Sequence, residues 1–103
     1  MIEKDRRSSQ RFKAKPGTHI IYIEGSGAIR DLSMEGVFVL DSDPLPVGTA
    51  VVFSLRLGTQ DIPLQGIVKH SVDREGMVIQ LTEMSREARR RLRLHIASLT
   101  SVS

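Results

Sequence analysis

The stretch Thr49-Ala-Val-Val-Phe-Ser-Leu-Arg-Leu57 alternates apolar and polar side chains with a period of two. Its apolar side chains fall on one face, at Val51, Phe53, Leu55 and Leu57. Ser54 and Arg56 lie on the opposite face. This period is typical of an antiparallel strand that packs one face on a core and turns the other to water. The stretch therefore predicts a half-buried strand near the middle of the chain.

Further strands are expected on both sides of this stretch. Apolar or β-branched runs occupy Thr18–Glu24, Ala28–Leu32, Gly36–Asp41, Asp61–Ser71 and Met77–Leu81. Short turn signals separate them, at Gly25-Ser26-Gly27, Gly58-Thr59-Gln60 and Asp73-Arg74-Glu75-Gly76. Six strands joined by short turns favour an antiparallel barrel or sandwich. Closure of such a sheet would bury both its apolar face and its edges.

A single helix is expected at the C-terminal end of the chain. Ser85 is suited to cap a helix, and Glu87 lies in the first turn. Apolar residues then recur at helical spacing, with arginines on the other side. We therefore divide the chain into a basic N-terminal arm (1–15), a barrel (16–84), and a C-terminal helix with its tail (85–103).

Charge and composition narrow the classes of function. The 103 residues carry a net charge of +3, with basic ends at 1–13 and 86–93 and an acidic middle. Only four aromatic residues are present, which argues against readers of single-stranded nucleic acid. The chain has no cysteine, so disulfides, thiolate metal sites and cysteine nucleophiles are excluded. No apolar run approaches about 18 residues, and the N-terminal residues lack the apolar stretch of a secretory signal. We expect a cytoplasmic protein.

Arginines are concentrated near the N-terminus, in the segment Asp5-Arg-Arg-Ser-Ser-Gln-Arg11. Arg7 and Arg11 are four residues apart, so their long side chains can converge on one small ligand, and Arg6 adds a third cation. Such a group suits an anion with planar acceptor edges, such as a nucleotide. A solvated basic arm without a ligand would have the same composition.

A second polar segment follows about twenty residues later, as Asp31-Leu-Ser-Met-Glu-Gly36. Asp31 offers acceptors, Ser33 can donate or accept, and Gly36 suits a positive φ or close approach to a ligand. A carboxylate can accept the N–H groups of a guanine, whose other edge matches an arginine fork. An ordinary turn between two strands would favour the same residue types.

Together, the two motifs resemble those of PilZ domains, a family of bacterial receptors for cyclic di-GMP. The first motif stands complete as Arg7-Ser-Ser-Gln-Arg11, and the second as Asp31-x-Ser33-x-x-Gly36. The resemblance continues through the later strands and the helix, over essentially the whole chain. It implies a six-stranded antiparallel β-barrel with one C-terminal helix, preceded by a flexible basic arm.

The resemblance also implies what each residue does. Arg7 and Arg11 would bind guanine edges and phosphates, Asp31 and Ser33 would hold a guanine from the other side, and Gly36 would leave room. The position of Arg6 is associated in the family with a stacked ligand dimer, which implies two molecules of cyclic di-GMP per protomer. The protein would signal by changing shape and binding an effector protein. It would need no cofactor or metal and would not be an enzyme.

Other functions remain open from the sequence. The chain could be a PilZ-like adaptor that binds proteins without nucleotide, or a small barrel that binds nucleic acid through its basic ends. The segregated charge and few aromatics argue against specific nucleic-acid binding. His19, His70 and His95 show no metal-ligand spacing. The effector could belong to motility, pilus assembly, biofilm polysaccharide synthesis or transcription.

Overall fold

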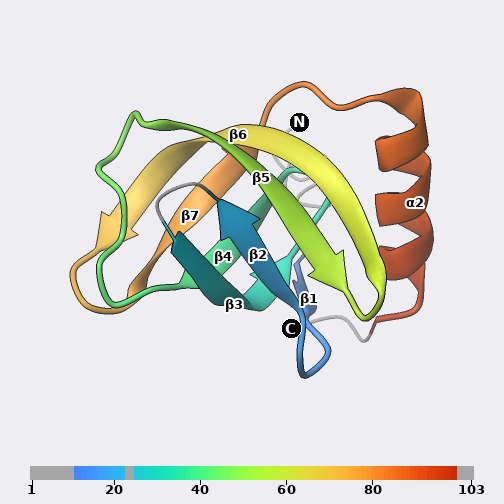
Figure 1. Ribbon diagram of the computed structural model, residues 1–103, viewed down its shortest axis with the longest axis horizontal. Helices are drawn as coiled ribbons and strands as arrows, with labels where there is room; N and C mark the ends of the chain where they lie inside the picture. The colour runs from blue at the N-terminus through green and yellow to red at the C-terminus, as the bar shows by residue number, and fades with distance from the viewer. Residues whose placement is uncertain (1–10, 23–24, 100–103) are drawn as a thin grey trace, which may run out of the picture.

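Six antiparallel strands close into a barrel, and one helix packs against it (Figure 1). The computed structural model describes residues 11–22 and 25–99. Within them the strands are β1 (Phe12–Lys13), β2 (His19–Tyr22), β3 (Gly25–Leu32), β4 (Gly36–Leu40), β5 (Ala50–Leu57), β6 (Gln60–Val72) and β7 (Gly76–Leu81). The helix α2 (Arg86–Ala97) follows the last strand. The predicted fold class, a six-stranded antiparallel barrel with a C-terminal helix, is confirmed.

The barrel is closed by a pairing between strands that follow each other in sequence. The order β3-β2-β5-β6-β7-β4 forms the sheet, and β3 then pairs with β4 to complete the ring. Every pairing is antiparallel, as expected where short turns connect neighbours. The two-residue β1 lies outside this ring and pairs with β3, which places Lys13 opposite Asp31.

The core fills the inside of the barrel with the alternating side chains of its strands. In β5 the predicted inward residues Val51, Phe53 and Leu55 are buried, while Val52 between them is 70% exposed. Leu57, at the end of the same strand, packs against the core while partly exposed. The period of two therefore gave the correct inward face of this strand.

The prediction of a hairpin turn at Gly25-Ser26-Gly27 is wrong, because these residues belong to β3. Gly25 pairs with Tyr22 and Gly27 with Ile20, so all three residues are paired within the strand. A Cβ on Gly27 would collide with the backbone carbonyl of Leu40 in β4. Glycine is therefore needed at this position because β4 approaches closely. From the local sequence alone, such a glycine cannot be distinguished from a glycine in a turn.

The other two predicted hairpins lie where they were expected. Gly58 has a φ of 65° and begins the short turn between β5 and β6, where a side chain would be strained. The turn between β6 and β7 contains Arg74, whose φ is also 65°. The strand count differs by one because β1 forms within the segment interpreted as an arm; residues 1–10 of that arm lie outside the described part.

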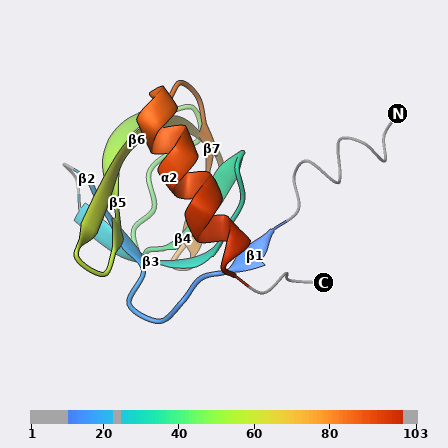
Figure 2. The same cartoon turned by 90° about the vertical axis from the view of Figure 1, so that its right-hand side faces the viewer.

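The helix begins where the capping signal predicted and covers one end of the barrel. The Ser85 side chain accepts a hydrogen bond from the backbone N–H of Ala88 at 3.0 Å. Ala88, Leu92 and Ile96 are buried against the core. In Figure 2 the strands surround the interior and α2 lies across the near end of the ring.

Across residues 11–22 and 25–99, no helix is long and apolar enough to cross a membrane.

The helix offers a matched test of its contribution to the core. Leu92 is fully buried and Leu94, on the same helix, is 61% exposed. Leu92→Ala should lower the free energy of unfolding by about 2–5 kcal/mol, because it removes buried methyl groups and leaves a cavity. Leu94→Ala should change it by less than about 0.5 kcal/mol. Urea unfolding followed by circular dichroism measures both, and similar losses would contradict this packing.

Candidate functional site

The turn between β3 and β4 is held together by the side chain of Ser33. Its Oγ accepts hydrogen bonds from the backbone N–H groups of Glu35 at 3.1 Å and Gly36 at 3.2 Å. The Ser33 backbone N–H donates to the Gly36 carbonyl at 2.8 Å. Ser33 is only 2% exposed, and its hydroxyl therefore serves the turn. The direct ligand contact predicted for Ser33 stays a prediction.

Gly36 lies at the start of β4, where that strand runs close to β7. A Cβ on Gly36 would lie 2.8 Å from the carbonyl oxygen of Ile79. Its φ is not positive, in contrast to Gly17, Gly48 and Gly58. The close approach of two strands thus explains glycine at this position, and the ligand space predicted at Gly36 stays a prediction.

Two arginines converge on the carboxylate of Asp31. The Nε of Arg11 donates to Oδ1 at 2.6 Å, and the Nε of Arg30 donates to Oδ2 at 2.8 Å. The Asp31 side chain is 10% exposed, whereas those of Arg11 and Arg30 are 37% and 57% exposed. Each carboxylate oxygen is thus paired with one guanidinium, and water still reaches both arginines.

A β-bulge brings Arg30 and Asp31 to the same place. The register between β3 and β4 shifts between Ile29 and Asp31, leaving Arg30 as the extra residue. Consecutive side chains of a regular strand point to opposite faces, so adjacent residues would not meet. Bulges re-aim side chains in this way and are frequent at binding sites.

Arg30 also stacks on an aromatic ring from the neighbouring strand. Its guanidinium carbon lies 3.8 Å from the ring centroid of Phe38, the residue opposite Asp31 in β4. Phe38 is 8% exposed and Arg30 covers it. Neither Arg30 nor Phe38 is among the site residues that the sequence predicts. Their positions beside the Asp31 motif were visible, but the bulge that joins them leaves no pattern in the sequence.

The predicted site residues are brought together as far as the structure describes them. Arg11 from the first motif contacts Asp31 from the second, and Ser33 and Gly36 form the turn that follows. Arg6 and Arg7 lie outside the described residues. We name Arg11, Arg30, Asp31 and Phe38 together the arginine–aspartate cluster.

The arginine–aspartate cluster combines three kinds of recognition in one place. Its two guanidinium groups donate to acceptor edges or phosphates, and its carboxylate accepts from N–H groups. The Arg30 plane, backed by Phe38, offers a surface on which a flat ring can stack. Two cations against one carboxylate leave a net charge of +1, which favours an anionic ligand.

Among residues 11–22 and 25–99, no three histidine, aspartate or glutamate side chains come together in an arrangement that could hold a metal ion.

The chain is similar both to a known protein family and to solved structures. The family model of the PilZ domain matches residues 5–98. The solved structure of the Bacillus subtilis inhibitor of motility (MotI/DgrA) is similar, with a TM-score of 0.76 and 18% sequence identity over 89% of this chain. The chain spans 49% of that protein, about half its length.

The solved structure of the uncharacterized Legionella protein Lpg0364 is also similar. Its TM-score is 0.63 at 19% identity, over 84% of this chain and 89% of the Legionella chain. At these identities the two structures support the fold. A search of curated proteins gave no match.

The turn that carries the site can be tested through Ser33. Ser33→Ala removes the acceptor for two turn N–H groups, so it should lower the free energy of unfolding by about 1–3 kcal/mol. Ser42→Ala, at an exposed serine in the β4–β5 loop, is the matched control and should change it by less than about 0.5 kcal/mol. Urea unfolding gives both values. A stable Ser33→Ala variant would show that its hydroxyl does not hold the turn.

Proposed function

The chain belongs to the PilZ domain family, and from this membership we propose that it is a receptor for cyclic di-GMP. PilZ domains are binding and adaptor domains, and no catalytic family is indicated. The proposed receptor binds the dinucleotide between the N-terminal arginines and the outer surface of the barrel. It then signals by a change of shape that alters its binding to an effector protein.

The observation that carries this proposal is the contact between Arg11 and Asp31. The two residues are twenty positions apart in sequence, in separate motifs, and their side chains meet at 2.6 Å. A guanine presents acceptors on one edge and donors on another, so it needs both an arginine and a carboxylate within its own width. The convergence supports one guanine site composed of both motifs.

Cyclic di-GMP would rearrange the ion pairs of the arginine–aspartate cluster. A carboxylate has about four lone-pair positions, so Asp31 can accept guanine N–H groups while keeping part of its contact with arginine. Arg11 would turn its fork to O6 and N7 of a guanine or to a phosphate. Arg7 would supply a second fork, and Ser33 and Gly36 would fix and shape the edge of the site.

The number of ligands and the partner are further parts of the proposal. Arg6 precedes the first motif, and we expect it to bind a second, stacked cyclic di-GMP molecule. The receptor would act in the cytoplasm on an effector protein. Motility is one candidate pathway, because the structurally similar Bacillus subtilis protein is an inhibitor of motility.

Binding can be measured by isothermal titration calorimetry with cyclic di-GMP. Arg7→Ala, Arg11→Ala and Asp31→Ala should each weaken binding about tenfold to a hundredfold, because each removes about 1–3 kcal/mol of directed contact with a base or phosphate. Arg93→Ala, at an exposed arginine of α2, is the charge-matched control and should retain the affinity. The fitted stoichiometry tests the expectation of two ligands.

Two outcomes would redirect the assignment. If tens of micromolar cyclic di-GMP produce no heat, the adaptor that works without nucleotide is favoured. If random oligonucleotides instead shift the protein in a gel at physiological salt, the nucleic-acid-binding alternative is favoured.

Arg30 gives a separate prediction for the binding mode. Its guanidinium is backed by Phe38 and its side chain is 57% exposed, so a guanine can stack on the free face. Arg30→Ala should weaken cyclic di-GMP binding about fivefold to thirtyfold, equivalent to about 1–2 kcal/mol. Arg30→Lys keeps the charge but lacks the planar group, so it should not restore the affinity. Full affinity in Arg30→Lys would show that charge alone is needed.

A further inference from the structure

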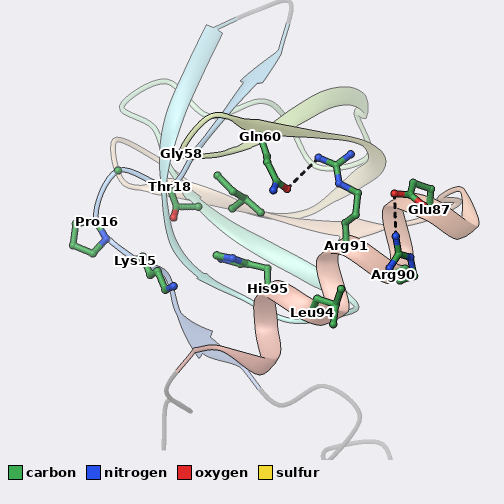
Figure 3. A pocket seen from close by; sticks show the side chains of 12 residues that line it. Lys15, Pro16, Thr18, Gly58, Gln60, Glu87, Arg90, Arg91, Leu94 and His95 are labelled. Carbon is green, nitrogen blue, oxygen red and sulfur yellow. Dashed lines mark hydrogen bonds and ion pairs between the residues drawn. The ribbon is translucent and has the colours of Figure 1, made fainter.

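A pocket lies away from the arginine–aspartate cluster, between α2 and the barrel (Figure 3). It measures about 830 Å³, and its walls come from the β1–β2 loop, the β5–β6 turn and one side of α2. None of the four residues of the arginine–aspartate cluster lines it. A volume of this size falls within the range of about 300–1,000 Å³ that is usual for small-molecule sites.

The charges around this pocket favour an anion. Lys15, Arg90 and Arg91 line it together with one carboxylate, that of Glu87, which leaves a net charge of +2 with histidine neutral. Arg90 and Glu87 form an exposed ion pair at 3.5 Å. Because salt screens such exposed pairs, this one contributes little to holding either side chain in place.

Arg91 is held in position by the barrel. Its NH2 group donates to the side-chain oxygen of Gln60 at 3.3 Å and to the backbone carbonyl of Asp61 at 3.1 Å. These contacts bring a guanidinium to the wall of the pocket while other N–H groups stay free to donate. Lys15, on the opposite wall, has no ion pair with any residue in 11–22 or 25–99.

His95 adds a buried polar atom without a partner. Its Nε2 is shielded from water and makes no hydrogen bond to the described residues. Figure 3 shows the ring beside the pocket, between Leu94 and the Lys15 segment. Burial lowers the pKa of His95 below its usual value, and the nearby Lys15 ammonium lowers it further. An anion beside the imidazole would offset both effects.

The pocket also has apolar surface for the uncharged part of a ligand. Leu57 forms part of its lining, and Leu94 lies at the helix wall with 61% of its surface exposed. From this arrangement we infer that the pocket between α2 and the β5–β6 turn binds a second ligand, a small phosphate-bearing molecule. Its phosphate lies against Lys15, Arg91 and His95, and its apolar part lies against the two leucines.

Inorganic pyrophosphate is a suitable probe, because it carries the phosphate chemistry alone. The pKa of His95, followed by NMR of its imidazole in a pH titration, should rise in a saturable way when pyrophosphate is added. His70 does not line the pocket, so its resonance is an internal control and should not respond to pyrophosphate.

Two lysines give a matched pair of variants. Lys15→Gln should weaken the pyrophosphate response about twofold to fivefold, as expected for the loss of one exposed charge contact. Lys13→Gln removes the same charge two residues away, outside the pocket, and should leave the response unchanged. Equal effects of the two variants would indicate general electrostatic attraction and overturn the inference.

Two further results would also overturn it. One is a His95 pKa that pyrophosphate does not change. The other is an equal response to malonate, a dicarboxylate, which would remove the assignment to phosphate. Because the experiment contains no cyclic di-GMP, its failure is distinguishable from a failure of the proposed receptor function.

Discussion

Strands β3 and β4 pair with each other, and through this pairing the two ends of the sheet become a closed barrel. Closure requires the backbones of neighbouring strands to approach closely at several points around the ring. A Cβ on Gly27, Gly66 or Gly76 would collide with a carbonyl of the adjacent strand. The apolar interior and the absence of free edges in the ring both depend on these close contacts.

The same pairing creates the candidate site. Its bulge lets Arg30 reach Asp31, and the turn that follows is held by the buried Ser33 hydroxyl. Phe38 lies opposite Asp31 because of the register of β3 and β4, and so becomes the support for the Arg30 guanidinium. Backbone pairing thus fixes the position of the Asp31 carboxylate, to which Arg11 and Arg30 bind.

Much of the fold could be predicted because periodicity and turn chemistry act over short distances. The alternation in β5 and the cap at Ser85 were both readable, since each depends on residues close in sequence. The prediction of a turn at residues 25–27 was wrong because glycine is favoured both in turns and where paired strands approach closely. Only the tertiary structure shows which of these two requirements applies at a given glycine. The two motifs could be paired through a family resemblance, but the contribution of Arg30 depends on a bulge that has no sequence signature. The pocket beside α2 was likewise invisible, because three separate segments form it.

We propose that cyclic di-GMP binds where Arg11 and Asp31 meet. Chemical-shift mapping of the ¹⁵N-labelled protein can examine this residue by residue, because backbone amides and arginine Nε groups report on contact with the ligand. Cyclic di-GMP should cause its largest shifts at the Nε groups of Arg11 and Arg30 and at the amides of residues 31–36. Shifts confined to α2, or no shifts at saturating ligand, would rule out binding at this site.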